Sequence, residues 1–202
     1  MINKMAHVIK TYYDDGQSEE EYFVNNGKKE GEYKSYYSNG QLYRICNYVD
    51  GKIEGEYIEY HGDGQLCVIC NYVDDKKQGE YKRYRGNGKI WVMCNYIDGK
   101  IEGEYIEYHG DGQLCVICNY VDDKKQGEYK RYRGNGKIWV MCNYIDGKIE
   151  GDYKSYYDNG QLHQICNFVD DKKEGEYKIY HENGQLDEIV YYVNNIQQYS
   201  II

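Results

Sequence analysis

The chain has 202 residues, a formal net charge of −9, 28 Tyr and no Pro. This acidic balance argues against a broad nucleic-acid or anionic-membrane surface. No apolar run approaches the roughly 20 residues of a membrane-spanning helix, and Met1 to Lys10 lack the continuous apolar core of a secretory signal. These features predict a soluble, cytoplasmic protein.

A 24-residue unit repeats along almost the whole chain. Repetition at a fixed period predicts an elongated array in which each unit packs on its neighbours. Residues 1–30 contain a degraded copy around Tyr12 to Gln17, which we interpret as an N-terminal capping repeat. Residues 31–190 form the regular array, with units that open at Gly31, Gly55, Gly79, Gly103, Gly127, Gly151 and Gly175.

Each unit contains two segments rich in aromatic and β-branched residues, separated by turn residues. The first turn is Asn-Gly or Asp-Gly, as in Asp63-Gly64, and this pair favours a type I′ hairpin turn. The second turn alternates between Asp-Gly, as in Asp50-Gly51, and Asp-Asp, as in Asp74-Asp75. The prediction is an all-β fold: an elongated, single-layer antiparallel β-meander of tandem 24-residue β-hairpin repeats.

Alternation along the second strand predicts which side chains share a face of the sheet. One face is expected to hold Leu66, Val68, Cys70 and Tyr72, and the other Cys67, Ile69, Asn71 and Val73. Neither set is purely polar, so we expect ladders of like side chains to stabilise the sheet instead of a thick core.

The eight cysteines are predicted to be free thiols. Cys67 and Cys70 have the spacing of half a zinc site, but residues three apart in a strand point to opposite faces. Equivalent cysteines lie two strands apart, about 9–10 Å, which is too far for a disulfide. We therefore expect no metal and no cofactor, and a reducing compartment.

No set of an acid, a base and a nucleophile occurs exactly once in the sequence, as a unique catalytic site would require. We therefore do not expect an enzyme. The histidines at His61, His109 and His181 share one repeat position and are interpreted as surface turn residues. Residues 50–103 are identical to residues 98–151, which indicates a tandem duplication. An array whose copy number changes does not depend on a unique site.

Basic clusters recur in alternate units. The candidate anion contacts are Lys82, Arg83, Arg85, Lys130, Arg131 and Arg133. They suggest binding to phosphate or lipid headgroups, or simply pairing with acidic side chains of neighbouring units. We favour pairing, because the net charge disfavours a membrane surface.

The segment 191–202 is predicted to be a C-terminal cap or tail. It contains no Lys or Arg. An uncharged edge strand is a template for pairing with another chain, and the alternative is a cap folded over its own edge.

The repeated pattern Gly55, Tyr57, Tyr60, Gly64 and Leu66, followed by Asn71-Tyr72, resembles the MORN repeat. The similarity is to the shorter variant found in bacterial antitoxin-like proteins and in large DNA viruses, and it spans about residues 10–193. The resemblance implies elongated hairpin sheets used for protein interaction or dimerisation, with phospholipid contact in some members.

We therefore expect a non-enzymatic scaffold that binds a protein partner or itself, and no nucleic acid. The alternative is a phospholipid-binding module that uses the basic clusters. The expected interaction surface consists of Tyr60, Tyr84, Trp91, Tyr108, Tyr132 and Trp139.

Overall fold

The computed structural model describes residues 7–201. The chain forms two compact units, Met1–Lys100 and Ile101–Ile202. Residues 1–6 and residue 202 lie outside the described residues. Residues 1–6 belong to the predicted capping repeat and to the segment Met1 to Lys10, which lacks the apolar core of a secretory signal.

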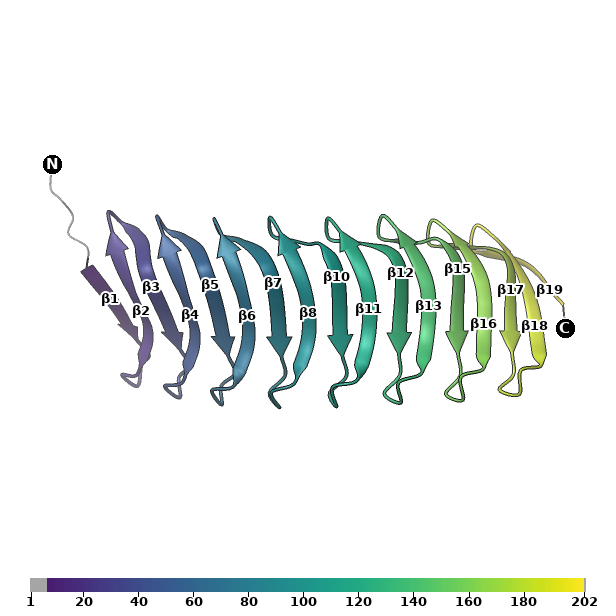
Figure 1. Cartoon of the computed structure of the whole chain (residues 1–202), viewed down its shortest axis with the longest axis horizontal. Helices are drawn as coiled ribbons and strands as arrows, with labels where there is room; N and C mark the ends of the chain where they lie inside the picture. The colour runs from purple at the N-terminus through teal and green to yellow at the C-terminus, as the bar shows by residue number, and fades with distance from the viewer. Residues whose placement is uncertain (1–6, 202) are drawn as a thin grey trace. The chain divides into compact units, whose positions relative to one another are not determined.

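Each unit is an antiparallel meander in which strands follow one another in chain order (Figure 1). The first unit contains β1 (His7–Tyr12), β2 (Ser18–Asn25), β3 (Lys28–Tyr36), β4 (Leu42–Val49), β5 (Lys52–Tyr60), β6 (Leu66–Val73), β7 (Lys76–Tyr84) and β8 (Ile90–Ile97). The short β9 (Lys100–Ile101) lies at the division between the units.

The second unit contains β10 (Gly103–Tyr108), β11 (Leu114–Val121), β12 (Lys124–Tyr132), β13 (Ile138–Ile145), β14 (Lys148–Ile149), β15 (Gly151–Tyr156), β16 (Leu162–Val169), β17 (Lys172–Tyr180), β18 (Leu186–Val193) and β19 (Ile196–Ile201). No helix occurs between residues 7 and 201, so none is present there that could span a membrane. The predicted all-β meander of 24-residue hairpin repeats is confirmed.

The two turns of a repeat differ in backbone conformation. At the second turn both residues have positive φ, 52° at Asp50 and 85° at Gly51, which is the type I′ conformation. At the first turn only the glycine is left-handed, with φ of 84° at Gly64. The amide of Gly64 donates to His61 O at 2.8 Å, which defines a type I turn followed by a left-handed glycine. The predicted type I′ first turn is therefore wrong, because this loop is one residue longer than a two-residue turn.

A β-bulge corrects the predicted faces of the second strand. Glu59 pairs with Val68 and Tyr60 with Leu66, so Cys67 is the additional residue of β6. Leu66 lies on the same face as Tyr60, and Cys67 packs against the cluster on the other face. The prediction was right for Val68, Cys70 and Tyr72 and wrong for Leu66 and Cys67.

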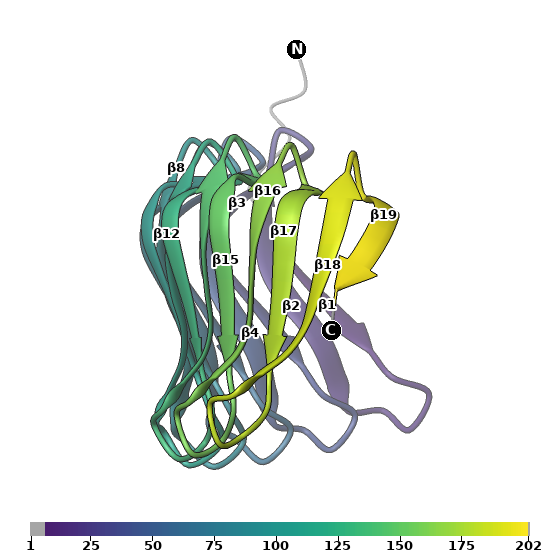
Figure 2. The same ribbon diagram turned by 90° about the vertical axis from the view of Figure 1, so that its right-hand side faces the viewer.

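The buried residues gather on one face, which we call the Tyr/Cys face. In the first unit its buried members are Tyr33, Cys46, Tyr57, Val68 and Cys70. The register alternates Tyr and Cys along this row, with Tyr33 opposite Cys46, Cys46 opposite Tyr57, and Tyr57 opposite Cys70. In the second unit Cys115, Val116 and Cys118 form the equivalent cluster. The strands bend along their length (Figure 2), and a bent single layer encloses the side chains of one face more than those of the other.

The C-terminal segment continues the sheet. β18 runs to Val193, so the predicted boundary at residue 191 falls inside this strand. β19 pairs antiparallel with β18, and all six of its residues are exposed. It therefore extends the sheet as a further strand and is not folded over the edge of β18.

Candidate functional site

The face opposite the Tyr/Cys face carries a row of open hollows. We call it the Ile/Asn face and define it in the first unit by Ile45, Asn47, Glu56, Ile58 and Tyr60, which line one hollow together. The register places Ile45 opposite Ile58, so two adjacent strands form an apolar floor. The hollow measures about 320 Å³.

Three more hollows use the same repeat positions in the second unit. We name each hollow by the residue that occupies the position of Ile58. The Lys130 hollow measures about 210 Å³, the Lys154 hollow about 400 Å³ and the Lys178 hollow about 330 Å³. Each includes an Asn and a carboxylate, and these are Asn119 with Glu128, Asn143 with Asp152, and Asn167 with Glu176.

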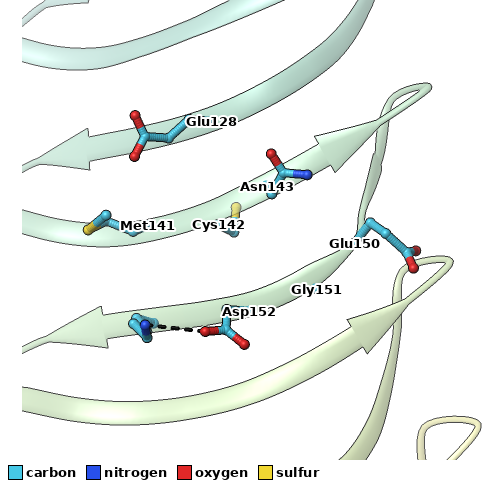
Figure 3. A pocket seen from close by; sticks show the side chains of 8 residues that line it. Glu128, Met141, Cys142, Asn143, Glu150, Gly151 and Asp152 are labelled. Carbon is cyan, nitrogen blue, oxygen red and sulfur yellow. Dashed lines mark ion pairs between the residues drawn. The ribbon is translucent and has the colours of Figure 1, made fainter.

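The lysine hollows contain an internal ion pair. In the Lys154 hollow, Lys154 Nζ lies 3.3 Å from Asp152 Oδ2, marked by the dashed line in Figure 3. The equivalent distances are 2.7 Å from Lys130 to Glu128 and 2.6 Å from Lys178 to Glu176. In the Ile58 hollow this position is apolar, and Glu56 is exposed without an ion pair in the described chain. The hollows thus share repeat positions but differ in charge.

The structure distributes the six predicted contact residues over both faces. Tyr60 lines the Ile58 hollow and Tyr132 the Lys130 hollow. Tyr84 and Tyr108 occupy the same strand position, opposite Ile90 and Leu114. The two tryptophans lie on the Tyr/Cys face, because each occupies the bulge position of Cys67. They are Trp91 and Trp139, the latter 37% exposed.

The predicted basic clusters are also divided between the faces. Lys82 and Lys130 lie on the Ile/Asn face, where they pair with Glu80 and Glu128 at 2.8 and 2.7 Å. The arginines lie against the tryptophans, with the guanidinium carbons of Arg83 and Arg85 4.6 and 4.7 Å from the Trp91 ring centroid. In the second unit the corresponding distances to Trp139 are 4.7 Å from Arg131 and 5.0 Å from Arg133. The six basic residues therefore do not form one continuous anion-binding patch.

Pairing between neighbouring repeats occurs at the second turns. Lys28 lies 2.6 Å from Asp50, and Lys52 lies 2.6 Å from Asp74. These pairs are exposed, so solvent screens them and each contributes little to stability.

Two of the three histidines that we predicted to be turn residues, His61 and His109, bond to the next repeat, whereas His181 Nε2 lies 3.2 Å from Asp187 Oδ1. His61 Nε2 lies 3.1 Å from Tyr84 O, and His109 Nε2 lies 3.0 Å from Tyr132 O. Tyr37 donates to Tyr60 O at 2.8 Å from the same repeat position. Sequence reasoning missed this contact, although the signal was there: a long polar side chain always precedes the first turn.

All eight cysteines are free, and seven of them are buried. Burial raises the pKa of Cys70 to about 11 and does the same for Cys94, Cys118, Cys142 and Cys166. A thiol that is buried and protonated is a poor nucleophile. Among residues 7–201, no three His, Cys, Asp or Glu side chains converge to hold a metal ion.

The hollows were missed by sequence reasoning. Their signal is the change between Lys and Ile two residues after the Glu or Asp that follows each opening glycine, as at Ile58 and Lys82. Net charge and the positions of the basic clusters do not show which carboxylate lacks a partner.

A family model described as "MORN repeat variant" matches seven consecutive segments. They are residues 29–50, 53–74, 77–98, 101–122, 125–146, 149–170 and 173–194. The chain belongs to the MORN repeat variant family. The resemblance inferred from Gly55, Tyr57 and Tyr60 is thereby confirmed. Each MORN segment spans one hairpin, as residues 29–50 span β3 and β4. No curated protein matches the chain.

Two solved structures resemble the MORN chain weakly. A chain in the crystal structure of TcdB2-TccC3 is 14% identical with a TM-score of 0.26, over 96% of this chain and 13% of that chain. A chain in the crystal structure of TcdB2-TccC3-Cdc42 is 14% identical with a TM-score of 0.25, over 93% of this chain and 12% of that chain. The protein thus spans about an eighth of the length of these chains. Scores this low establish neither a shared fold nor a shared activity.

Proposed function

We propose that this MORN protein is a non-enzymatic scaffold that binds other proteins through the hollows of its Ile/Asn face. The observation that carries the proposal is the recurrence of four hollows at the same repeat positions. Each combines an apolar or Lys-covered floor with an Asn and a carboxylate at the rim. Small-molecule sites enclose most of the ligand's surface, whereas these hollows are open. They therefore suit single side chains of a partner protein better than a small molecule.

Repetition gives the proposed scaffold its affinity. One shallow hollow provides little binding energy. Once a partner occupies one hollow, however, its binding to a second hollow becomes an intramolecular step. A partner that occupies two or more hollows therefore binds far more tightly than one that occupies a single hollow.

The test is photocrosslinking with p-benzoylphenylalanine placed at one site per variant. Incorporation at Glu32 places the crosslinker at the rim of the Ile58 hollow, and incorporation at Arg83 places it on the Tyr/Cys face. We expect a stoichiometric crosslinked protein, identified by mass spectrometry, from the Glu32 variant and not from the Arg83 variant. Crosslinking from Arg83 alone would contradict the choice of face, and a crosslinked second copy would identify self-association.

Phospholipid binding is the second candidate. It is favoured by Arg131 and Trp139, both exposed on one face with the guanidinium 4.7 Å from the indole centroid. The net charge of −9 opposes it. Under this candidate, an Arg83→Glu/Arg131→Glu double variant loses flotation with anionic liposomes. Under the scaffold proposal, the wild-type chain does not float with them.

We also propose a reducing compartment for the protein. The support is that the eight cysteines are unpaired and mostly buried. Alkylation of the denatured protein, isolated without reductant, is expected to modify all eight thiols, and fewer would indicate oxidation in the cell.

A further inference from the structure

The Ile58 hollow contains polar groups that the chain itself does not use. Glu56 and Asn47 are both exposed and line this hollow. Neither side chain has a hydrogen bond or ion pair with another described residue, whereas Glu32 at the far rim pairs with Lys34 at 2.5 Å. The hollow therefore offers one carboxylate and one amide oxygen as free acceptors.

The other hollows show which group complements this carboxylate. In each of them a lysine from the same strand places its ammonium 2.6 to 3.3 Å from the equivalent carboxylate. Figure 3 shows this arrangement at Asp152. Ile58 replaces the lysine in the repeat that opens at Gly55, so the carboxylate of Glu56 is kept and the cation is missing.

Ile58 also changes the floor. Ile45 lies opposite Ile58, and Ile58 lies opposite Ile69, so three branched apolar side chains form a continuous row across three strands. A long cationic side chain places its methylene stem on such a surface and its charged end in a polar rim.

We propose that the Ile58 hollow binds an arginine side chain of a partner protein, an inference that rests on the proposed scaffold function. The guanidinium donates to the Glu56 carboxylate and to the Asn47 amide oxygen, and the stem lies on Ile45 and Ile58. Arginine fits better than lysine, because its planar fork carries five donors and reaches two acceptors at once. The net charge of −9 attracts a basic segment from solution.

The probe is the peptide acetyl-Gly-Arg-Gly-amide, and its control is the same peptide with citrulline, which is neutral and has nearly the same shape. Both are titrated into the full chain labelled at the Ile δ1 methyl groups, and methyl chemical shifts are followed at low salt. We expect saturable shifts of the Ile45 and Ile58 methyls with the arginine peptide, and shifts at least several-fold smaller with citrulline. Equal shifts with both peptides, or none with arginine, would overturn the proposal.

Three variants locate the interaction, with the Ile45 methyl as the reporter. Glu56→Gln removes the charge and Ile58→Lys copies the lysine hollows, so each is expected to abolish the arginine-dependent shift. Glu176→Gln alters the Lys178 hollow and is expected to leave the shift unchanged. A shift that survives Glu56→Gln would show that the carboxylate is not the acceptor and would overturn the assignment.

Failure of this inference and failure of the scaffold proposal give different results. If the crosslinker at Glu32 captures a partner and Ile58→Lys does not reduce that capture, the scaffold stands and the arginine assignment fails. If the arginine peptide binds but no position on the Ile/Asn face crosslinks to a protein, the cationic site stands and the scaffold proposal fails.

Discussion

The rings of Tyr57 and Tyr72 lie 5.0 Å apart at an angle of 49°, within one hairpin of the Tyr/Cys face. The equivalent pair recurs as Tyr81 with Tyr96 at 5.5 Å. Tyr57 is 7% exposed, although the sheet is a single layer. Ring pairs of this kind provide the buried surface that a second layer supplies in other β-proteins.

Loss of the Tyr57 ring is expected to destabilise the first unit. Tyr57→Ala should lower the free energy of unfolding by about 3–5 kcal/mol, the usual cost of deleting a buried aromatic ring. Tyr57→Phe should cost about 1 kcal/mol, because it removes only the hydroxyl that bonds to Glu59. Urea unfolding followed by circular dichroism measures both. Tyr12→Ala is the control, since Tyr12 is 57% exposed, and an equal loss there would contradict the assignment.

The opening glycine of a repeat is expected to be required for its backbone conformation. Gly55 has a φ of +82°, and a Cβ added to it would meet no other atom within 4 Å, so Gly55→Ala adds only backbone strain, about 1–2 kcal/mol. Gly62 also has open space but no positive φ. Gly62→Ala should therefore be neutral or stabilise the chain by up to about 1 kcal/mol. Thermal unfolding of the two variants compares them, and similar melting temperatures would refute the strain argument.

Asp75 combines a left-handed backbone with a bond that compensates for it. Its φ is +67°, and its Oδ1 accepts a hydrogen bond from Ile53 N at 2.6 Å. Asp75→Ala keeps the strain and loses the acceptor, whereas Asp75→Gly loses the acceptor and relieves the strain, as at Gly51. The alanine variant should be about 1–2 kcal/mol less stable than the glycine variant. If urea midpoints place the alanine variant at or above the glycine variant, the explanation is wrong.

Stability is expected to fall at alkaline pH. Burial raises the pKa of Cys70 and Cys142 from 9.0 to about 11, so the folded chain retains these protons after the unfolded chain has lost them. Stability from this source is full below pH 9.0 and is lost as the pH rises through about 11. Urea midpoints measured over this range should fall less steeply for a Cys70→Ala/Cys142→Ala double variant than for the wild-type chain. An unchanged slope would show that Cys70 and Cys142 do not contribute to the alkaline loss of stability.

The repeat period and the turn residues were sufficient to predict the hairpins, because Gly64 and the Asp-Gly pairs restrict the backbone locally. The turn type and the position of Cys67 were not predictable in the same way. Both depend on strand register, and the additional residue in the first loop and in β6 becomes visible only when Tyr60 is paired with Leu66.

Part of the candidate site was also accessible from the sequence. Tyr60 and Tyr132 were predicted as contact residues and line hollows. Trp91 was assigned to the same surface, but the bulge places it on the opposite face against Arg83. Glu56 lacks a partner among residues 7–201 because Ile58, two residues later on the same face, replaces the lysine of other repeats. Composition alone could not reveal this difference.

The bond that His61 makes to Tyr84 O has a consequence for how the length of this protein can change. Its counterpart from His109 to Tyr132 O lies in the second copy of the duplicated block. Such bonds join only adjacent repeats, so a recombination event that deletes or inserts one block rejoins every donor with an acceptor of the same kind. Repeat number can then vary in steps of two repeats without leaving a donor or an acceptor unpaired, and the number of hollows would vary with it.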